Sequence, residues 1–144
     1  MRAKRGFTLV EILIVVVILG ILAAIVVPQF TQASTEAKMN SVCSNLQSLR
    51  SQIELYKVQH NDTPPGLGAA GATFISQMTE TTTVAGAASG SKTRDATHIY
   101  GPYLERVPEN PFNNLNTLSA DGSGAGWGYD AATGEIFDPC HPTL

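Results

Sequence analysis

The chain has 144 residues, of which 43% are apolar and 15% are charged, and its formal net charge at pH 7 is −3. The length allows one domain, and the charged fraction is below the ~25% that is usual for a soluble globular protein. Such a charge does not indicate a nucleic-acid-binding protein. The two cysteines, Cys43 and Cys140, are too few for a disulfide-rich mini-protein or a zinc cluster.

These averages conceal an uneven distribution along the chain. Arg2, Lys4 and Arg5 lie in the first six positions, and the next twenty-one residues, 7–27, read FTLVEILIVVVILGILAAIVV with Glu11 as their single charge. As a helix that rises ~1.5 Å per residue, this segment spans roughly 31 Å, which is about the thickness of a bilayer core. The preceding basic residues predict that the amino end stays in the cytoplasm while the rest of the chain crosses the membrane.

Three interpretations of the apolar segment compete. A secretory signal peptide has a shorter apolar core and a cleavage site with small residues, whereas residues 25–27 continue the apolar run past Ala23 and Ala24. A plain membrane anchor leaves Glu11 unexplained, because an acidic side chain inside a bilayer is costly and usually functional. The third interpretation is a segment that leaves the bilayer during its working life and needs Glu11 once it has left.

The segment begins with the motif Arg5-Gly6-Phe7-Thr8-Leu9-Val10-Glu11, and its apolar run ends at Pro28. This motif resembles the class III signal of type IV prepilins and type II secretion pseudopilins. In that family a membrane prepilin peptidase cuts after the glycine, on the cytoplasmic side, and N-methylates the new terminus. The resemblance implies that Gly6 precedes the cut, that Phe7 becomes N-methylphenylalanine, and that Glu11 is the acid at the fifth position after the cut.

Such a cut gives Glu11 a chemical role. The new α-amine at Phe7 would lie close to Glu11 in the first turn of a helix, where a carboxylate also complements the helix dipole. In a bundle of these helices, Glu11 of one subunit would face the Phe7 ammonium of its neighbour. A subunit in the wrong register would leave the carboxylate unpaired, which is costly in a low-dielectric setting. We therefore expect Glu11 to set the register of assembly.

Helical periodicity continues beyond the apolar segment. Gly20 and Pro28 are positions where the helix can loosen or kink during packing. The 28–60 half then carries an amphipathic stripe with a spacing of three or four residues, made of Met39, Val42, Leu46, Leu49, Ile53 and Tyr56. We expect one helix from about Phe7 to His60, whose stripe packs against the globular part of the same chain.

The carboxy-terminal region, residues 61–144, holds 11 of the 13 glycines and 7 of the 8 prolines, and it needs the amphipathic helix as one wall of its core. A short helix is expected around residues 74–78, and residues 79–96 read as a flexible surface loop. Residues 127–137 read as a hairpin. The hairpin side chains expected to pack on the helix are Trp127, Tyr129, Ile136 and Phe137.

Residues 100–112 read YGPYLERVPENPF. The GPYL…VP…NPF pattern resembles the region after the helix in the G-type major pseudopilin of type II secretion, where it leads into a small antiparallel sheet. The fold class implied is α+β and type IV pilin-like, with a long N-terminal helix packed on a small C-terminal antiparallel sheet. The parts expected are a cleaved leader (1–6), a transmembrane and filament-core helix (7–27), an amphipathic helix half (28–60) and a periplasmic globular region (61–144).

Two further expectations concern a metal and a disulfide. Major pseudopilins commonly bind calcium in a loop of the sheet, and Asp121, Ser123 and Asp130 offer hard oxygen ligands. The acidic run that closes the family's loop is not evident, and a solvated Asp-Gly turn is the alternative. The oxidising compartment outside the inner membrane allows a disulfide between Cys43 and Cys140, although pilins usually carry both cysteines in the globular part.

The sequence gives little sign of an enzyme. The three histidines, His60, His98 and His141, lie far apart in the sequence without metal-ligand spacing, and a lone loop histidine is usually solvated. Neither a nucleophile elbow nor a paired-carboxylate motif stands out. Removal of the leader leaves six basic and twelve acidic residues, a net charge of −6, which argues against binding nucleic acid through a basic patch.

The resemblance therefore implies a structural subunit of a type II secretion pseudopilus, a periplasmic filament that drives protein export. Its expected partners are other copies of itself, the prepilin peptidase, minor pseudopilins, the inner-membrane assembly platform and a cytoplasmic ATPase. The expected location is the bacterial inner membrane, as a single-pass protein with a periplasmic carboxy-terminal region. The alternatives are a type IV pilus subunit for adhesion or motility, and a membrane-anchored periplasmic enzyme.

Overall fold

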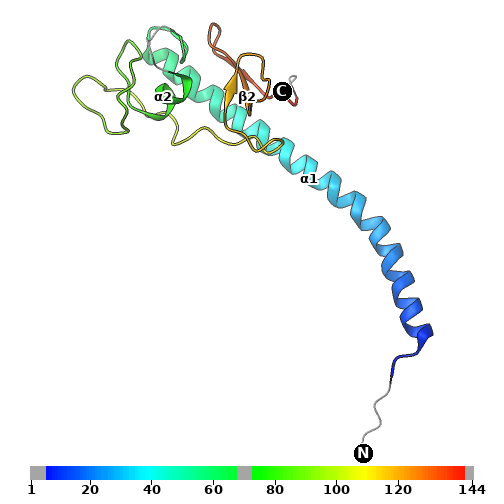
Figure 1. Ribbon diagram of the computed structural model, residues 1–144. Helices are drawn as coiled ribbons and strands as arrows, with labels where there is room; N and C mark the ends of the chain where they lie inside the picture. The colour runs from blue at the N-terminus through cyan, green and yellow to red at the C-terminus, as the bar shows by residue number, and fades with distance from the viewer. Residues whose placement is uncertain (1–5, 68–72, 142–144) are drawn as a thin grey trace, which may run out of the picture. The chain divides into compact units, whose positions relative to one another are not determined.

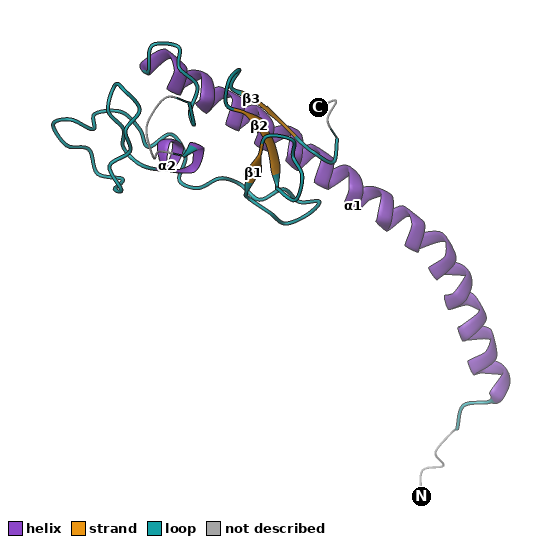
Figure 2. Ribbon diagram, turned by 45° about the horizontal axis from the view of Figure 1, so that its top comes forward, coloured by secondary structure: helices purple, strands orange, loops and turns teal. Residues whose placement is uncertain are grey.

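The computed structural model describes residues 6–67 and 73–141. Those residues form two α-helices and one small sheet (Figures 1 and 2), in the order α1 (Leu9–Gln59), α2 (Phe74–Thr79), β1 (Leu118–Ser119), β2 (Trp127–Asp130) and β3 (Glu135–Phe137). The chain divides into two compact units, Met1–Met39 and Asn40–Leu144. The elements confirm the α+β, pilin-like fold class.

Helix α1 runs for 51 residues and continues through Pro28. It begins two residues later than expected and ends one residue earlier. At its carboxy end, Asn61 and Asp62 adopt left-handed φ angles of 52° and 60°, and the Asp62 N–H donates to the Lys57 carbonyl at 2.9 Å. A left-handed residue just past the last turn is a common helix stop, so the chain ends α1 before His60.

The predicted stripe on α1 forms one wall of the core of the second unit. The helix contributes Val42, Leu46, Leu49, Ile53 and Tyr56, each at most 1% exposed. Packed into the same cluster are residues from α2, the loops and the sheet, namely Phe74, Met78, Val107, Trp127, Tyr129 and Ile136. Met39, the first residue of the predicted stripe, is half-buried. The helix therefore supplies the apolar surface that the glycine- and proline-rich region lacks.

The sheet differs in one respect from the antiparallel sheet expected. Strands β2 and β3 form the predicted antiparallel hairpin, with Tyr129 opposite Ile136. Strand β1, however, pairs with β2 in parallel, over only two residue pairs. The tight connection between them turns through Gly122 and Gly124, at φ angles of 75° and 64°, which glycine adopts without a steric penalty. The sheet is therefore mixed.

Phe137 does not join the cluster on the helix. Side chains alternate between the two faces of a strand, and Ile136 already faces the core. The Phe137 ring lies instead against the backbone of Gly128, where an added Cβ would come within 2.1 Å of two ring atoms. Trp127, Tyr129 and Ile136 pack as expected.

Residues 79–96 are also less loop-like than expected. Thr81 and Thr82 are fully buried. Thr82 makes isolated bridges to Ala88 and Tyr100, and the Thr81 hydroxyl bonds to Ser89 at 2.6 Å. Because the Thr81 hydroxyl is satisfied by Ser89 and by backbone carbonyls, and the Thr82 hydroxyl by His60, this polar sequence packs against the core.

Candidate functional site

The predicted cleavage and methylation residues precede α1 and are exposed. Phe7 is 80% exposed. Among the described residues, a Cβ added at Gly6 would meet no heavy atom within 4 Å. Packing within the described part of the chain therefore does not require glycine at position 6, and cleavage after Gly6 stays a prediction.

The first turn of α1 holds Glu11 through a reciprocal pair of contacts with Thr8. The Glu11 Oε2 atom accepts hydrogen bonds from the Thr8 N–H at 2.8 Å and the Thr8 hydroxyl at 2.9 Å. The Glu11 N–H donates in return to Thr8 Oγ1 at 3.3 Å. This is a capping box, and its Thr-x-x-Glu spacing was visible in the sequence. The Glu11 carboxylate thus has hydrogen-bond partners within the chain itself.

The first unit presents an apolar surface that nothing in the described chain covers. Every residue from 6 to 38 is exposed, and the strongly apolar ones include Leu9 at 82% and Phe30 at 74%. An 18-residue window of α1 has a mean hydropathy of 3.3, so the helix is long and apolar enough to cross a membrane. A continuous apolar surface of this kind marks a membrane or association site.

The two predicted kink positions lie within this exposed part of α1. In the described chain, a Cβ added at Gly20 would meet no heavy atom within 4 Å. Pro28 lacks the N–H that would continue the helical ladder, and three residues later the Thr31 hydroxyl donates to the Val27 carbonyl at 3.2 Å. A role for Gly20 and Pro28 in loosening the helix stays a prediction.

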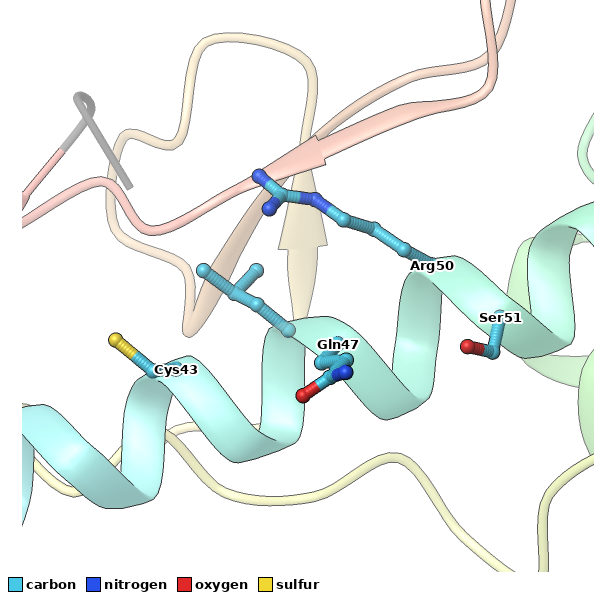
Figure 3. Close-up of a pocket in the computed structure, with 5 residues that line it drawn as sticks. Cys43, Gln47, Arg50 and Ser51 are labelled. Carbon is cyan, nitrogen blue, oxygen red and sulfur yellow. The ribbon is translucent and has the colours of Figure 1, made fainter.

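Both cysteines have free, exposed thiols in the structure. Cys43 lies on α1 beside a groove of about 370 Å³ (Figure 3), which is also lined by Leu46, Gln47, Arg50 and Ser51. Arg50 extends from the helix to the Ile136 carbonyl at 3.1 Å. Partial desolvation and the nearby Asp138 carboxylate raise the pKa of the Cys140 thiol. A Cys43–Cys140 disulfide stays a prediction, which mass analysis without reductant decides.

The three candidate calcium ligands lie in two separate turns. Asp121 Oδ1 accepts from the Ser119 hydroxyl at 2.6 Å and the Ser123 N–H at 2.9 Å, and these bonds lower the pKa of Asp121. Asp130 Oδ1 accepts from the Ala132 N–H at 2.8 Å. Each carboxylate thus serves its own turn.

Calcium takes about six to eight oxygen ligands. Across residues 6–67 and 73–141, no three His, Cys, Asp or Glu side chains form a group that could hold a metal ion. The candidate set fits calcium poorly in this arrangement, and calcium binding there stays a prediction.

His60 is buried rather than solvated, with only 2% exposed. Its Nδ1 lies 2.8 Å from the Tyr56 carbonyl and its Nε2 lies 3.0 Å from the Thr82 hydroxyl. The imidazole stacks on the Tyr56 ring with the centroids 3.8 Å apart. Burial lowers the pKa of His60, so the ring is a neutral structural link between the end of α1 and the 79–96 segment.

Comparison with known protein families identifies a motif at the amino terminus of the chain. Residues 1–27 match the family model of the prokaryotic N-terminal methylation motif. This match includes Gly6, Phe7 and Glu11. No solved structure matches the chain at a significant level.

Relatives along most of the chain carry one name, type II secretion system core protein G. The protein from Aeromonas hydrophila is 32% identical over 124 residues, which cover 84% of this chain and 76% of the relative. The Klebsiella pneumoniae protein is 30% identical over 125 residues, covering 85% and 79%. The Vibrio cholerae protein is 29% identical over 157 aligned positions, covering 96% and 97%. The chain therefore belongs to the family of the type II secretion system core protein G, the major pseudopilins.

Proposed function

We propose that this pseudopilin is processed between Gly6 and Phe7 and then assembles through α1 into the pseudopilus of a type II secretion system. The observation that carries the proposal is the exposed apolar surface of residues 7–30, which includes the capped Glu11 in the first helical turn. In a filament, neighbouring copies would cover that surface and replace the lipid. The chain thereby acts as a structural subunit.

Maturation would proceed in the membrane. A prepilin peptidase would remove the leader, residues 1–6, and methylate the amine of Phe7. The amino end would lie in the cytoplasm, residues 7–27 would span the inner membrane, and the globular region, residues 61–144, would lie in the periplasm. The 28–60 half of the helix would join the two environments, since its core-facing stripe belongs to the globular unit.

Glu11 would exchange partners during assembly. In the single subunit its carboxylate accepts two hydrogen bonds from Thr8. In the filament, the methylated ammonium of a neighbouring Phe7 would offer a charged donor, and charge-assisted hydrogen bonds are roughly twice as strong as neutral ones. Only the correct axial register brings the two groups together, so this exchange would favour correctly placed subunits.

The remaining steps involve other components of the secretion system. The proposed partners are the inner-membrane assembly platform, a cytoplasmic ATPase and minor pseudopilins, and the growing filament would push folded proteins through an outer-membrane channel. We propose no catalytic role, since the chain's relatives are structural pseudopilins. Their name does not favour a type IV pilus, and secretion and twitching assays on a deletion strain separate the two systems.

The decisive experiment compares two acidic residues of α1. Glu11→Leu removes the proposed register group, whereas Glu36→Leu changes an exposed carboxylate further along the same helix. We expect Glu11→Leu to be cleaved normally but to give no filaments, and Glu36→Leu to assemble like wild type. Wild-type assembly of Glu11→Leu would contradict the register role.

The mass of the amino-terminal peptide tests maturation independently. We expect the peptide to begin with N-methylated Phe7. An intact leader would overturn the processing step and favour a membrane-anchored periplasmic protein instead.

A further inference from the structure

A buried carboxylate lies just after the last strand, in a place that the assembly function does not use. Asp138 is 0% exposed. Its Oδ1 accepts hydrogen bonds from Asn110 Nδ2 at 2.7 Å and from the Cys140 N–H at 3.1 Å. Its Oδ2 lies 2.9 Å from His141 Nδ1. Three donors from two separate parts of the chain therefore converge on one carboxylate.

Asn110 is the second fully buried member of this group. Its Nδ2 donates to Asp138 Oδ1 and also to the Gly126 carbonyl, at 2.8 Å. Its side-chain oxygen accepts from the Phe112 N–H at 3.0 Å, and its backbone N–H donates to the Leu115 carbonyl at 2.9 Å. The amide thus joins the 110–115 turn to the start of β2 and to the turn after β3.

His141 closes the group from the outer side. Its side chain is 32% exposed, and its ring packs against the Phe112 ring with the centroids 4.6 Å apart. The imidazole therefore contacts both the carboxylate and the 110–115 turn. We call Asn110, Asp138 and His141 together the Asp138 clamp.

We infer that the Asp138 clamp fixes the loops around the sheet without a divalent cation. A bound cation stabilises loops by drawing oxygen atoms from separate segments together. Here the Asn110 amide nitrogen performs that task, because it lies between the Asp138 carboxylate and the Gly126 carbonyl and bonds to both. Burying a carboxylate is unfavourable unless donors compensate for its lost hydration, and the clamp provides those donors from the chain itself.

The polar groups around the sheet support the same conclusion. Within the part of the chain that the structure describes, every buried side-chain nitrogen and oxygen has a hydrogen-bond partner. The carboxylates of Asp121 and Asp130 already accept hydrogen bonds in their own turns. These turns are therefore held by hydrogen bonds of the chain itself, and the clamp would hold the sheet without a cation.

Thermal unfolding of the full chain in detergent tests the inference. Trp127 is the single tryptophan, it is fully buried, and it follows Gly126, so its fluorescence reports this region directly. We expect the wild-type Tm to be the same in EDTA and in calcium chloride. Asp138→Ala removes all three acceptor contacts and should lower Tm by about 10 °C in both buffers. Asp138→Asn keeps one acceptor oxygen and should give an intermediate Tm.

Asp121→Asn is the matched control, because it removes a candidate calcium ligand from an exposed turn while keeping an acceptor oxygen there. It should melt like wild type in both buffers. A wild-type Tm that is several degrees lower in EDTA than in calcium chloride would overturn the inference. A Tm of Asp138→Asn in EDTA that equals the wild-type Tm in EDTA would overturn it as well. If Asp138→Ala does not fold, these two Tm comparisons still test the inference.

Discussion

The buried imidazole of His60 shows how one side chain can link the long helix to the polar segment beyond it. Its Nδ1–H donates to the Tyr56 carbonyl and its Nε2 accepts from the Thr82 hydroxyl. That arrangement requires the neutral ring. Protonation would place a second N–H against the Thr82 hydroxyl and a positive charge among the rings of Tyr56, Tyr100 and Tyr103.

This environment predicts a pH-dependent stability. Burial lowers the pKa of His60 from its ordinary value of 6.5, so below that pH the unfolded chain binds the proton more readily than the folded chain does. The stabilising contribution is therefore present above pH ~6.5 and is lost as the pH falls through the folded pKa. We expect Tm to decrease between pH 7 and pH 5.

Substitution of His60 isolates this effect. His60→Gln should flatten the dependence of Tm on pH over that range, whatever its Tm at pH 7, because glutamine does not titrate. His98→Gln, at a histidine that contacts Asp95 rather than the rings around His60, is the matched control, and the slope should change more in His60→Gln than in this control. If Tm changes with pH equally in wild type and His60→Gln, another group is responsible for the pH dependence.

Single residues also mark the limit of inference from the sequence. Gly6, Phe7 and Glu11 were identified because a contiguous motif carries them. The Thr8 cap had a signal in the Thr-x-x-Glu spacing. The buried pair of Asp138 and Asn110 had none, because the two residues are 28 positions apart and only the folded chain brings them together.

At the scale of elements, α1 was predictable and the sheet was only partly so. The stripe on α1 repeats over several turns, and a long repeat constrains both the helix and the face that it buries. The β2–β3 hairpin follows from aromatic and β-branched residues around a short turn. Strand β1 has two residues, which is too short for a periodic pattern, so its parallel pairing depends on the glycine-containing connection to β2.

The end of that connection and the strand after it give a prediction about two glycines, Gly126 and Gly128. A Cβ at Gly126 would lie 2.0 Å from the Leu115 carbonyl oxygen, which belongs to the backbone, whereas a Cβ at Gly128 would meet the outer atoms of the Phe137 ring at 2.1 Å. A ring can rotate away, but a backbone carbonyl can move only with its segment. We expect Gly126→Ala to lower the free energy of unfolding by about 3 kcal/mol and Gly128→Ala by about 1 kcal/mol.

Urea unfolding followed by Trp127 fluorescence measures both values in the full chain. The two variants add the same methyl group two residues apart, so each is the control for the other. Equal losses, or a larger loss for Gly128→Ala, would contradict the argument from the Leu115 carbonyl.

At the scale of the whole molecule, one continuous helix belongs to two compact units. In the first unit its apolar side chains are exposed, and in the second its stripe is almost entirely buried. Apolar composition alone predicted the exposed apolar half of α1, and helical periodicity predicted the buried stripe. The family then follows from the motif at the start of the chain together with relatives that cover most of its length.

This division predicts that equivalent substitutions in the two parts of α1 have different consequences. Leu49 is 0% exposed and Leu22 is 52% exposed. Leu49→Ala removes buried methyl groups from the core and should lower the free energy of unfolding by about 2–5 kcal/mol. Leu22→Ala removes the same atoms from a surface that the chain itself does not cover, so the unfolding midpoint reported by Trp127 should stay at the wild-type value. Because helix propensity favours alanine slightly over leucine, any small change at Leu22 should not be destabilising. A loss at Leu22 as large as that at Leu49 would mean that the apolar half of the helix contributes to the core, and the assignment of that half to lipid and filament contacts would be wrong.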